Sequence, residues 1–454
     1  MKNIVTTFCM TLAVATAAGA EDNMAFVENE HIRVGVHLKW GGAVTHVSEP
    51  GGPNLINSYD LGRQIQQSYY SGPSNYQREG KEKAKHWAKF PWNPIQTGDA
   101  FRNGSEVLEH RVDGDTLYVR TIPNLWPMKN DPAACVMETW LKISSDGPKL
   151  LYKARLTNRR RDKTQYSARP QEIPAIYVNG PWHRLMTYNG DEPFSGKPLS
   201  EIRNGHGEPW PWVNFLATER WAALVNDDGT GLGVCVPAVR EFHGGFAGRR
   251  GSGGEKSSNT GYMSPMTREV LDHNIVYEYS CIIVLGSLEE IRTEAKRLSA
   301  KAGLPSWSFE KSRDSWTYVN GKDAGWPLPK SGGLTGQATK KGRPVRLVSP
   351  HTFWRAEAAD RVQIQLSSKS EGTLKVFWRD MPTKASSTKP SEWAAWSKTC
   401  WQKERSISAD LPRGSRRTVT VKLAGAPGYE GGITGLAIDV PDGVTVHAVR
   451  VLDR

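Results

Sequence analysis

Cysteine is scarce in this chain of 454 residues, and the five cysteines are widely spaced. No CxxC pair or similar close spacing is present, so a zinc cluster built on sulfur is not expected. Three of the cysteines, Cys135, Cys235 and Cys281, stand in or beside apolar runs, which is typical of buried thiols. Cys400 is the fourth outside the N-terminal segment. In an oxidising compartment distant cysteines can also pair, so the sequence leaves disulfide formation open.

Long apolar runs are absent beyond the N-terminal segment, which predicts no membrane-spanning helix in the rest of the chain. Residues 1–20 have the composition of a secretory signal: Lys2 supplies the positive start, 4–18 the apolar run, and Ala-Gly-Ala at 18–20 the cleavage pattern. We therefore expect cleavage before Glu21 and a soluble mature protein in the periplasm or outside the cell.

Motifs for nucleotide and serine chemistry are also missing. The sequence contains no P-loop, no GxSxG elbow and no GxGxxG after a strand. It has no helix-turn-helix, zinc-finger or RNP-like pattern, and its positive residues are dispersed, so nucleic acid is not the expected partner. The net charge of +12 nevertheless favours an anionic partner, and an acidic polysaccharide would fit an exported protein. General solubility is the alternative explanation of the charge, and nothing indicates an oligomeric state.

Short alternating or apolar runs separated by Gly, Pro, Asn and Asp predict an all-β protein. Residues 21–304 are expected to form a large antiparallel two-sheet sandwich, closed by one helix near 287–302 with a Ser287/Glu290 capping box. The Gly-, Lys- and Pro-rich interval 305–342 is predicted to be a linker or a long irregular wrap. Residues 343–454 resume a β-pattern and predict a second, smaller β-sandwich.

The stretch 54–99 is unusually rich in residues that bind sugars. A saccharide presents hydroxyls and apolar C–H faces, so its site needs amides, carboxylates and arginine together with flat aromatic rings. The alternative is that these are ordinary strand and turn residues, with the aromatics buried and the amides solvated. The stretch contains Asp60, Arg63, Gln64, Gln66, Gln67, Tyr69, Tyr70, Asn75, Tyr76, Trp87, Trp92, Asn93, Gln96 and Asp99.

A charged pair interrupts the strand-like run 169–177, where Arg169 and Gln171 precede Glu172. Strand interiors disfavour Glu unless it faces a cleft or has a partner, so Glu172 is the leading candidate for a catalytic carboxylate. The alternative is that Glu172 only anchors an arginine. Arg169, Gln171 and Trp212 are expected to join the sugar-binding set.

Two reactions fit these residue types. In β-elimination, Arg169 or Arg63 would neutralise a uronate carboxylate while His183, Tyr177 or Tyr70 exchanges protons. In hydrolysis, two carboxyls would face each other across the glycosidic bond, and Asp60, Asp99 or Glu138 would accompany Glu172. The sequence does not choose between them.

Metal and cofactor sites receive little support. His206 and Glu208 have a spacing found in some loop metal sites, but no third ligand stands near them. His243 is expected to be structural. No cofactor is predicted, and a structural Ca²⁺ stays open.

Several segments carry a resemblance to known families. The first resemblance rests on three segments: Trp-Gly-Gly-Ala-Val at 40–44, Gly-Pro-Asn-Leu-Ile-Asn at 52–57 and Asp-Leu-Gly-Arg-Gln-Ile-Gln at 60–66. Through these segments, residues 25–300 resemble the galactose-mutarotase-like superfamily. That resemblance implies a β-supersandwich acting on carbohydrates, as in some polysaccharide lyases and glycoside hydrolases. The Asn-His-x-Tyr-Phe-Asn segment of aldose epimerases is missing, which argues against simple mutarotase activity.

The C-terminal part resembles a galactose-binding-like jelly roll of the carbohydrate-binding-module type. The resemblance rests on Leu-Lys-Val-Phe-Trp at 374–378, on Trp393, Trp396 and Trp401, and on the Gly-rich segment 428–439. The sequence therefore predicts an exported protein that binds a polysaccharide and cleaves it as a hydrolase or lyase. The alternatives are a non-catalytic glycan-binding protein and, more remotely, a structural envelope protein.

Overall fold

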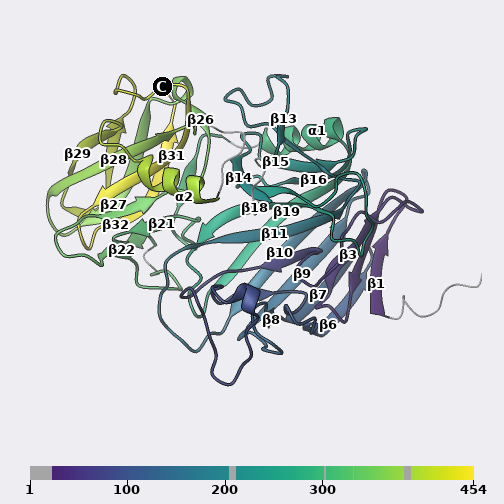
Figure 1. The fold of residues 1–454 in the computed structure, drawn as a ribbon. Helices are drawn as coiled ribbons and strands as arrows, with labels where there is room; N and C mark the ends of the chain where they lie inside the picture. The colour runs from purple at the N-terminus through teal and green to yellow at the C-terminus, as the bar shows by residue number, and fades with distance from the viewer. Residues whose placement is uncertain (1–22, 204–210, 301–302, 331, 383–389, 454) are drawn as a thin grey trace, which may run out of the picture.

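The structure, a computed structural model, describes residues 23–203, 211–300, 303–330, 332–382 and 390–453 (Figure 1). The predicted signal segment and the His206/Glu208 pair lie outside these residues. Strands dominate the described part, and the prediction of an all-β fold is confirmed. No helix in the described part is long and apolar enough to cross a membrane.

The first domain consists of two large antiparallel sheets. The ten-stranded sheet runs in the order β1 (Met24–Glu28), β2 (Arg33–His37), β3 (Ala43–Ser48), β4 (Ile65–Ser68), β11 (Arg169–Asn179), β18 (Thr260–Glu269), β17 (Glu241–Ala247) and β14 (Trp212–Leu216). Off this path, β5 (Pro94–Ile95) pairs with β4, and β8 (Asn124–Leu125) pairs with β5. The nine-stranded sheet runs in the order β13 (Ser200–Ile202), β12 (Arg184–Thr187), β15 (Trp221–Val225), β16 (Thr230–Cys235), β19 (Val276–Ser287), β10 (Lys149–Asn158), β9 (Cys135–Ile143), β7 (Thr116–Ile122) and β6 (Glu106–Asp113).

A continuous apolar core fills the space between these two sheets. Ile173 and Ile176 of β11 reach it from the ten-stranded sheet, and Leu150 of β10 and Ile283 of β19 reach it from the other. Because side chains alternate along a strand, the remaining residues of the ten-stranded sheet point to its opposite face. That opposite face carries the candidate site.

Helix α1 (Leu288–Ser299) covers the outer face of the nine-stranded sheet through Ile291 and Ala295. Its predicted capping box is present, since Ser287 accepts a hydrogen bond from the Glu290 backbone and the Glu290 side chain accepts one from Ser287. Such a cap satisfies two backbone donors at the helix start.

The second domain is a smaller sandwich of antiparallel sheets. One sheet contains β20 (Ser306–Ser308), β32 (Thr445–Leu452), β27 (Arg361–Ser368) and β30 (Gly414–Lys422), with β23 (Leu334–Thr335) beside β32. The other contains β21 (Thr317–Val319), β25 (Val345–Val348), β31 (Gly432–Val440), β28 (Gly372–Asp380) and β29 (Ser406–Leu411), with β26 (Trp354–Arg355) beside β31. A further pair is β22 (Gly321–Lys322) with β24 (Gln337–Ala338), and the 3-10 turns are η2 (Lys85–Trp87) and η3 (Ala356–Ala358).

The interval 305–342 differs from its prediction as a linker or irregular wrap. It supplies β20 through β24, and its Trp307, Phe309 and Trp316 are buried in the core of the second domain. Sparse apolar residues in a Gly- and Pro-rich stretch hid this role, because isolated large aromatics give no periodic signal.

A second helix, α2 (Pro390–Thr399), was not predicted. It extends from the second domain towards β14 (Figure 1). Its Trp393 and Trp396 lie three residues apart, on one face, and both rings lie against His351. The described cysteines, whose pairing the sequence left open, are four buried free thiols: Cys135, Cys235, Cys281 and Cys400.

Candidate functional site

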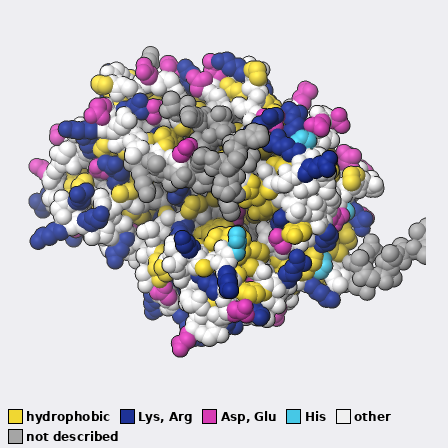
Figure 2. Space-filling view, in the orientation of Figure 1, with side chains coloured by type: hydrophobic (Ala, Val, Ile, Leu, Met, Phe, Trp, Pro, Cys, Tyr) yellow, Lys and Arg dark blue, Asp and Glu magenta, His cyan; other side chains and the backbone are white. Residues whose placement is uncertain are grey.

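A pocket of about 800 Å³ opens on the face of the ten-stranded sheet opposite the core. Strands β4, β11, β14, β17 and β18 form its floor, and residues of 60–63 and 87–93 form one wall. Trp393 of α2 adds a wall from the second domain. Hydrophobic side chains gather near the centre of this side of the molecule, with Lys and Arg side chains around them (Figure 2). The volume is within the range of small-molecule and oligosaccharide sites, and we call it the Glu172 pocket.

Strand alternation explains why polar residues of β11 face this pocket. Ile173 and Ile176 enter the core, whereas Glu172, Ala175 and Tyr177 line the pocket. The pairing of β11 with β18 shifts register between Glu172 and Ile176, with one extra residue on β11. A bulge of this kind changes the face to which the following residues point. Without it, Tyr177 would face the core rather than share a face with Glu172.

The carboxylate of Glu172 is held by two tyrosines. Tyr70 donates a hydrogen bond of 2.9 Å to Oε2, and Tyr262 of the neighbouring strand donates a short one to Oε1. Burial, together with the negative charge of Glu172, raises the pKa of Tyr70 and Tyr262 well above the ordinary value. Both hydroxyls therefore stay protonated and act as donors at neutral pH. Glu172 does not form an ion pair within the described chain, so the role of arginine anchor finds no support.

Aromatic rings flank this carboxylate on two sides. On one side, the Trp87 ring lies 4.6 Å from Phe90 and 5.8 Å from Trp126. On the other, the Tyr262 ring lies 4.6 Å from Tyr177 and 5.0 Å from Trp212. All of these residues line the pocket. Flat apolar surfaces beside hydrogen-bonding groups are the features that a sugar ring requires.

Positive charge exceeds negative charge in the pocket lining. Its basic members are Arg63, Lys89, Arg169 and Arg268, and its acidic members are Asp60 and Glu172, so four positive charges face two negative ones. Arg63 lies 3.5 Å from Asp60. Arg169 donates to the Gly72 carbonyl and the Ser74 hydroxyl, and neither it nor Arg268 forms an ion pair within the described part of the chain. An anionic ligand would balance this excess.

His243 also lines the pocket, with its ring centroid 5.9 Å from that of Tyr262. Burial lowers its pKa to about 4, so its imidazole is neutral near pH 7. From the sequence, His243 was expected to be structural, because a single His near a strand end has no distinguishing signal.

Nine residues of the predicted sugar-binding stretch and strand are buried within the protein instead, and eight of them have side-chain hydrogen bonds to it. Gln171 bonds both the amide and the carbonyl of Tyr70, Gln96 donates to the Gly41 and Gly42 carbonyls, and Asp99 accepts from the amides of Phe101 and Asn103. These polar side chains satisfy the hydrogen-bonding needs of backbone amides and carbonyls in the first domain. The eight hydrogen-bonded residues are Gln64, Gln66, Gln67, Tyr69, Asn93, Gln96, Asp99 and Gln171, and the ninth, Trp92, is buried in an apolar cluster. Gln66 and Asn93 reach the pocket edge, but their amides are already engaged.

The predicted catalytic residues are split by the fold. Glu172, Tyr177 and Asp60 line the pocket. His183 does not line it: its imidazole lies 3.1 Å from the Pro181 carbonyl and 3.4 Å from Asp227, beside the nine-stranded sheet. Of the second carboxylates weighed for hydrolysis, Glu138 pairs with Arg155 on that other sheet. Contrary to the prediction, His183 and Glu138 therefore do not share the pocket with Glu172.

Tyr262, Met266 and Arg268 of β18 also line the pocket and were not predicted to do so. Their spacing in Thr-Gly-Tyr-Met-Ser-Pro-Met-Thr-Arg-Glu places Tyr262, Met266 and Arg268 on one strand face. The alternation was the available signal. Trp126 was missed too, since it follows β8 in an irregular segment.

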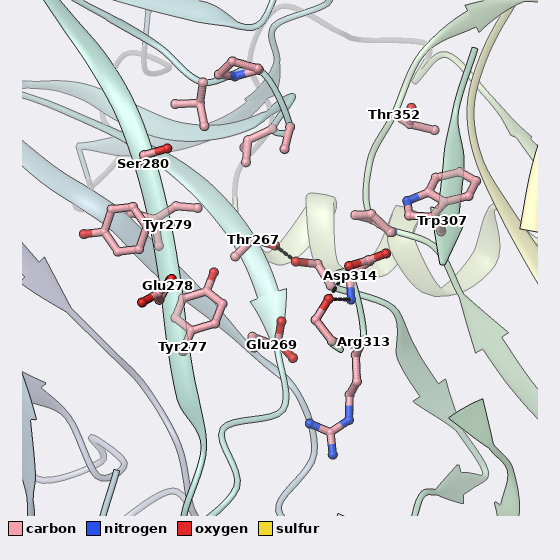
Figure 3. A pocket seen from close by; sticks show the side chains of 18 of the residues that line it. Thr267, Glu269, Tyr277, Glu278, Tyr279, Ser280, Trp307, Arg313, Asp314 and Thr352 are labelled. Atoms are coloured by element: carbon pink, nitrogen blue, oxygen red, sulfur yellow. Dashed lines mark hydrogen bonds between the residues drawn. The ribbon is translucent and has the colours of Figure 1, made fainter. Parts of the chain in front are cut away.

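A larger cavity of about 940 Å³ lies between the two domains (Figure 3). Thr267 donates a hydrogen bond to Ser315 in this cavity, and Arg313 points away from it to Asp272 and Asp323. These bonds hold the domains together. The Glu172 pocket is the better candidate, because it combines a carboxylate held by two tyrosines with flanking aromatic rings and an excess of positive charge. Among the described residues, no cluster of His, Cys, Asp or Glu is suited to hold a metal ion.

Comparisons with known proteins give similarity only in structure. No protein-family model matches the chain, and no curated protein sequence matches it. A galactose mutarotase-like protein from Lactobacillus casei ATCC 334 matches with a TM-score of 0.34 and 12% identity, over 58% of this chain and 99% of that one. A GH36 alpha-galactosidase from Geobacillus stearothermophilus matches with 0.35 and 8%, over 60% and 41%. A 4-alpha-glucanotransferase from Thermococcus litoralis matches with 0.30 and 10%, over 58% and 37%.

These solved structures include the galactose-mutarotase-like type that the sequence predicted for residues 25–300. The jelly-roll resemblance of the second domain stays a prediction. At such low identities and TM-scores, the pocket geometry is the better guide to function.

Proposed function

We propose that this protein binds an anionic polysaccharide in the Glu172 pocket and cleaves it by β-elimination next to a uronate. The observation that carries the proposal is the Tyr70–Glu172–Tyr262 cluster, in which one carboxylate accepts hydrogen bonds from two protonated tyrosines. The excess of arginine around it supports an acidic substrate. Export by the predicted signal would bring the protein to such glycans.

The cluster can move a proton without leaving a tyrosinate behind. Tyr262 takes the proton from C5 of the uronate while its own proton passes to Glu172. The C5–H electrons form the C4=C5 double bond, and the C4–O bond breaks. Glu172 then passes a proton to Tyr70, whose hydroxyl proton goes to the leaving oxygen. General acid and base are thus linked through one carboxylate, which agrees with the raised pKa values of both tyrosines.

The other pocket residues have supporting roles in this scheme. Arg63, Arg169 and Arg268 line the pocket and would neutralise the uronate carboxylate, whose charge would otherwise oppose removal of the C5 proton. The rings of Tyr177 and Trp212 offer an apolar face to the sugar, and neutral His243 offers a hydrogen bond to a hydroxyl.

Hydrolysis is the second candidate, and one observation favours it: Asp60 is another carboxylate in the pocket lining. Asp60 accepts a hydrogen bond from the Gly62 amide and lies beside Arg63, and both oxygens of Glu172 are already engaged by tyrosines. A hydrolase needs one protonated carboxyl and one free carboxylate across the bond. The tyrosine contacts therefore favour elimination.

The deciding experiment incubates the mature protein with polygalacturonate, alginate, chondroitin sulfate and hyaluronan. Elimination produces ultraviolet absorbance from unsaturated uronates, whereas hydrolysis produces reducing ends without it. Tyr262→Phe should abolish the absorbance signal and keep the melting temperature. Reducing ends alone would establish hydrolysis. Neither signal, with retention on glycan-containing gels, would establish a non-catalytic binding protein, and no binding at all would overturn the proposal.

A further inference from the structure

A second cavity, of about 290 Å³, adjoins the Glu172 pocket at the boundary between the domains. Met266 and Arg268 line both cavities, so the two share a wall. The second cavity is also lined by Thr317 and Val319 of β21 and by Arg346 of β25, all from the second domain. We call it the interface groove.

The interface groove is strongly basic. Its charged lining consists of four arginines, Arg240, Arg268, Arg346 and Arg379, and one carboxylate, Glu241. Glu241 is occupied elsewhere, since it accepts a hydrogen bond of 2.8 Å from the Trp393 indole and lies 3.4 Å from His351 Nε2.

Three of these arginines lack a carboxylate partner within the described part of the chain. Arg240 is 6% exposed and donates to the carbonyls of Thr218 and Phe353. Arg379 is 2% exposed and donates to the hydroxyl and carbonyl of Thr434. Arg268 forms no ion pair. Arg346 differs, because it pairs with Asp439 through two hydrogen bonds.

Buried arginines keep their charge and are costly without a counter-charge. Burial lowers the pKa of both Arg240 and Arg379, and the opposing effect of Glu241 on Arg379 does not offset the effect of burial. A carboxylate or sulfate of a ligand would supply the missing negative charge. Arg268 faces both cavities, so one anionic chain can pass from the Glu172 pocket into the groove.

We infer that the interface groove is a subsite for an anionic sugar unit of the same polysaccharide chain whose neighbouring unit occupies the Glu172 pocket. The second domain is then a structural part of the substrate site rather than a separate binding module. This inference rests on the proposed function and extends it to the length of chain that the protein recognises.

The test compares Val319→Glu with Val319→Gln. Val319 lines the groove but not the Glu172 pocket and is 47% exposed, so neither change disturbs the core. The probes are the disaccharide and the hexasaccharide of whichever of the four glycans above binds wild-type protein most tightly. The Glu variant should weaken hexasaccharide binding about fivefold or more through repulsion of the anionic chain, and should leave disaccharide binding within about twofold. The Gln variant is the uncharged comparison of similar size, so the hexasaccharide should bind the Glu variant at least about fivefold more weakly than the Gln variant.

Equal hexasaccharide affinity of the Glu and Gln variants would overturn the inference while leaving the proposed function intact. So would an equal loss for both oligosaccharide lengths, because a groove subsite is reached only by the longer chain. If wild-type protein binds none of the four glycans, the proposed function itself fails, and this inference fails with it.

Discussion

The Tyr70 hydroxyl lies 2.9 Å from the Glu172 carboxylate, although 102 residues separate the two in the chain. Tyr70 follows β4, and Glu172 lies on β11, which pairs with β4. The contact joins the Gln- and Tyr-rich stretch near residue 65 to the charged strand near 170. It places a hydrogen-bonded carboxylate at the centre of the pocket.

Replacement of this carboxylate should remove turnover. Glu172→Gln keeps the size and one hydrogen-bond acceptor but cannot take up a proton, so the rate of glycan cleavage should fall by about 100-fold or more. The measurement is initial rate on the best substrate, with thermal melting to show that the fold is kept. Glu138→Gln, on the other sheet, is the matched control. Full turnover by Glu172→Gln would disprove the catalytic assignment.

Arg268→Gln should weaken binding of the acidic glycan about tenfold or more, since it removes a charge-assisted contact to a carboxylate. The affinity of wild-type protein should fall as salt rises, and the variant should show a shallower salt dependence. Isothermal titration at several salt concentrations measures both. Arg203→Gln serves as the control, because Arg203 lies outside the pocket and pairs with Glu201. Identical salt slopes for wild type and Arg268→Gln would argue against an anionic ligand at this site.

His243 should make stability depend on pH. Burial lowers its pKa from 6.5 to about 4, so between these values the unfolded chain binds more protons than the folded protein. Its contribution is fully present above pH 6.5 and is lost as the pH falls towards 4, by up to about 3 kcal/mol. Urea unfolding at pH 7.5 and pH 4.5 should show a larger loss for wild type than for His243→Asn. An equal loss in both proteins would show that His243 does not titrate in this way.

Replacement of Arg313, which joins the two domains, should lower the free energy of unfolding. This residue is 1% exposed and pairs with Asp272 of the first domain and with Asp323. Arg313→Ala leaves two buried carboxylates without their partner and should lower the free energy of unfolding by about 3–5 kcal/mol. The urea midpoint measures this. The ion pair of Arg361 with Asp360, in which the Arg361 side chain is 40% exposed, provides the comparison, since Arg361→Gln should change the midpoint less. Equal effects of the two changes would place the interdomain contact elsewhere.

The sequence alone predicted much of the fold. Short alternating runs indicated strands, and Ser287 with Glu290 fixed the start of α1, because both signals are local in the chain. Glu172 stood out for a local reason as well, since a charged residue inside a strand requires a partner or a cleft.

Only the tertiary structure decided which polar residues face the pocket. Gln96 and Asp99 are residue types found in sugar sites, yet Gln96 bonds the backbone of the β2–β3 turn and Asp99 bonds the backbone of its own loop. Tyr262 and Arg268, distant in sequence, reach the pocket because β18 pairs with β11. Pairing register and one bulge set these directions, and both depend on strands far apart in the chain. Local pattern therefore specified the strands, whereas long-range pairing assembled the site.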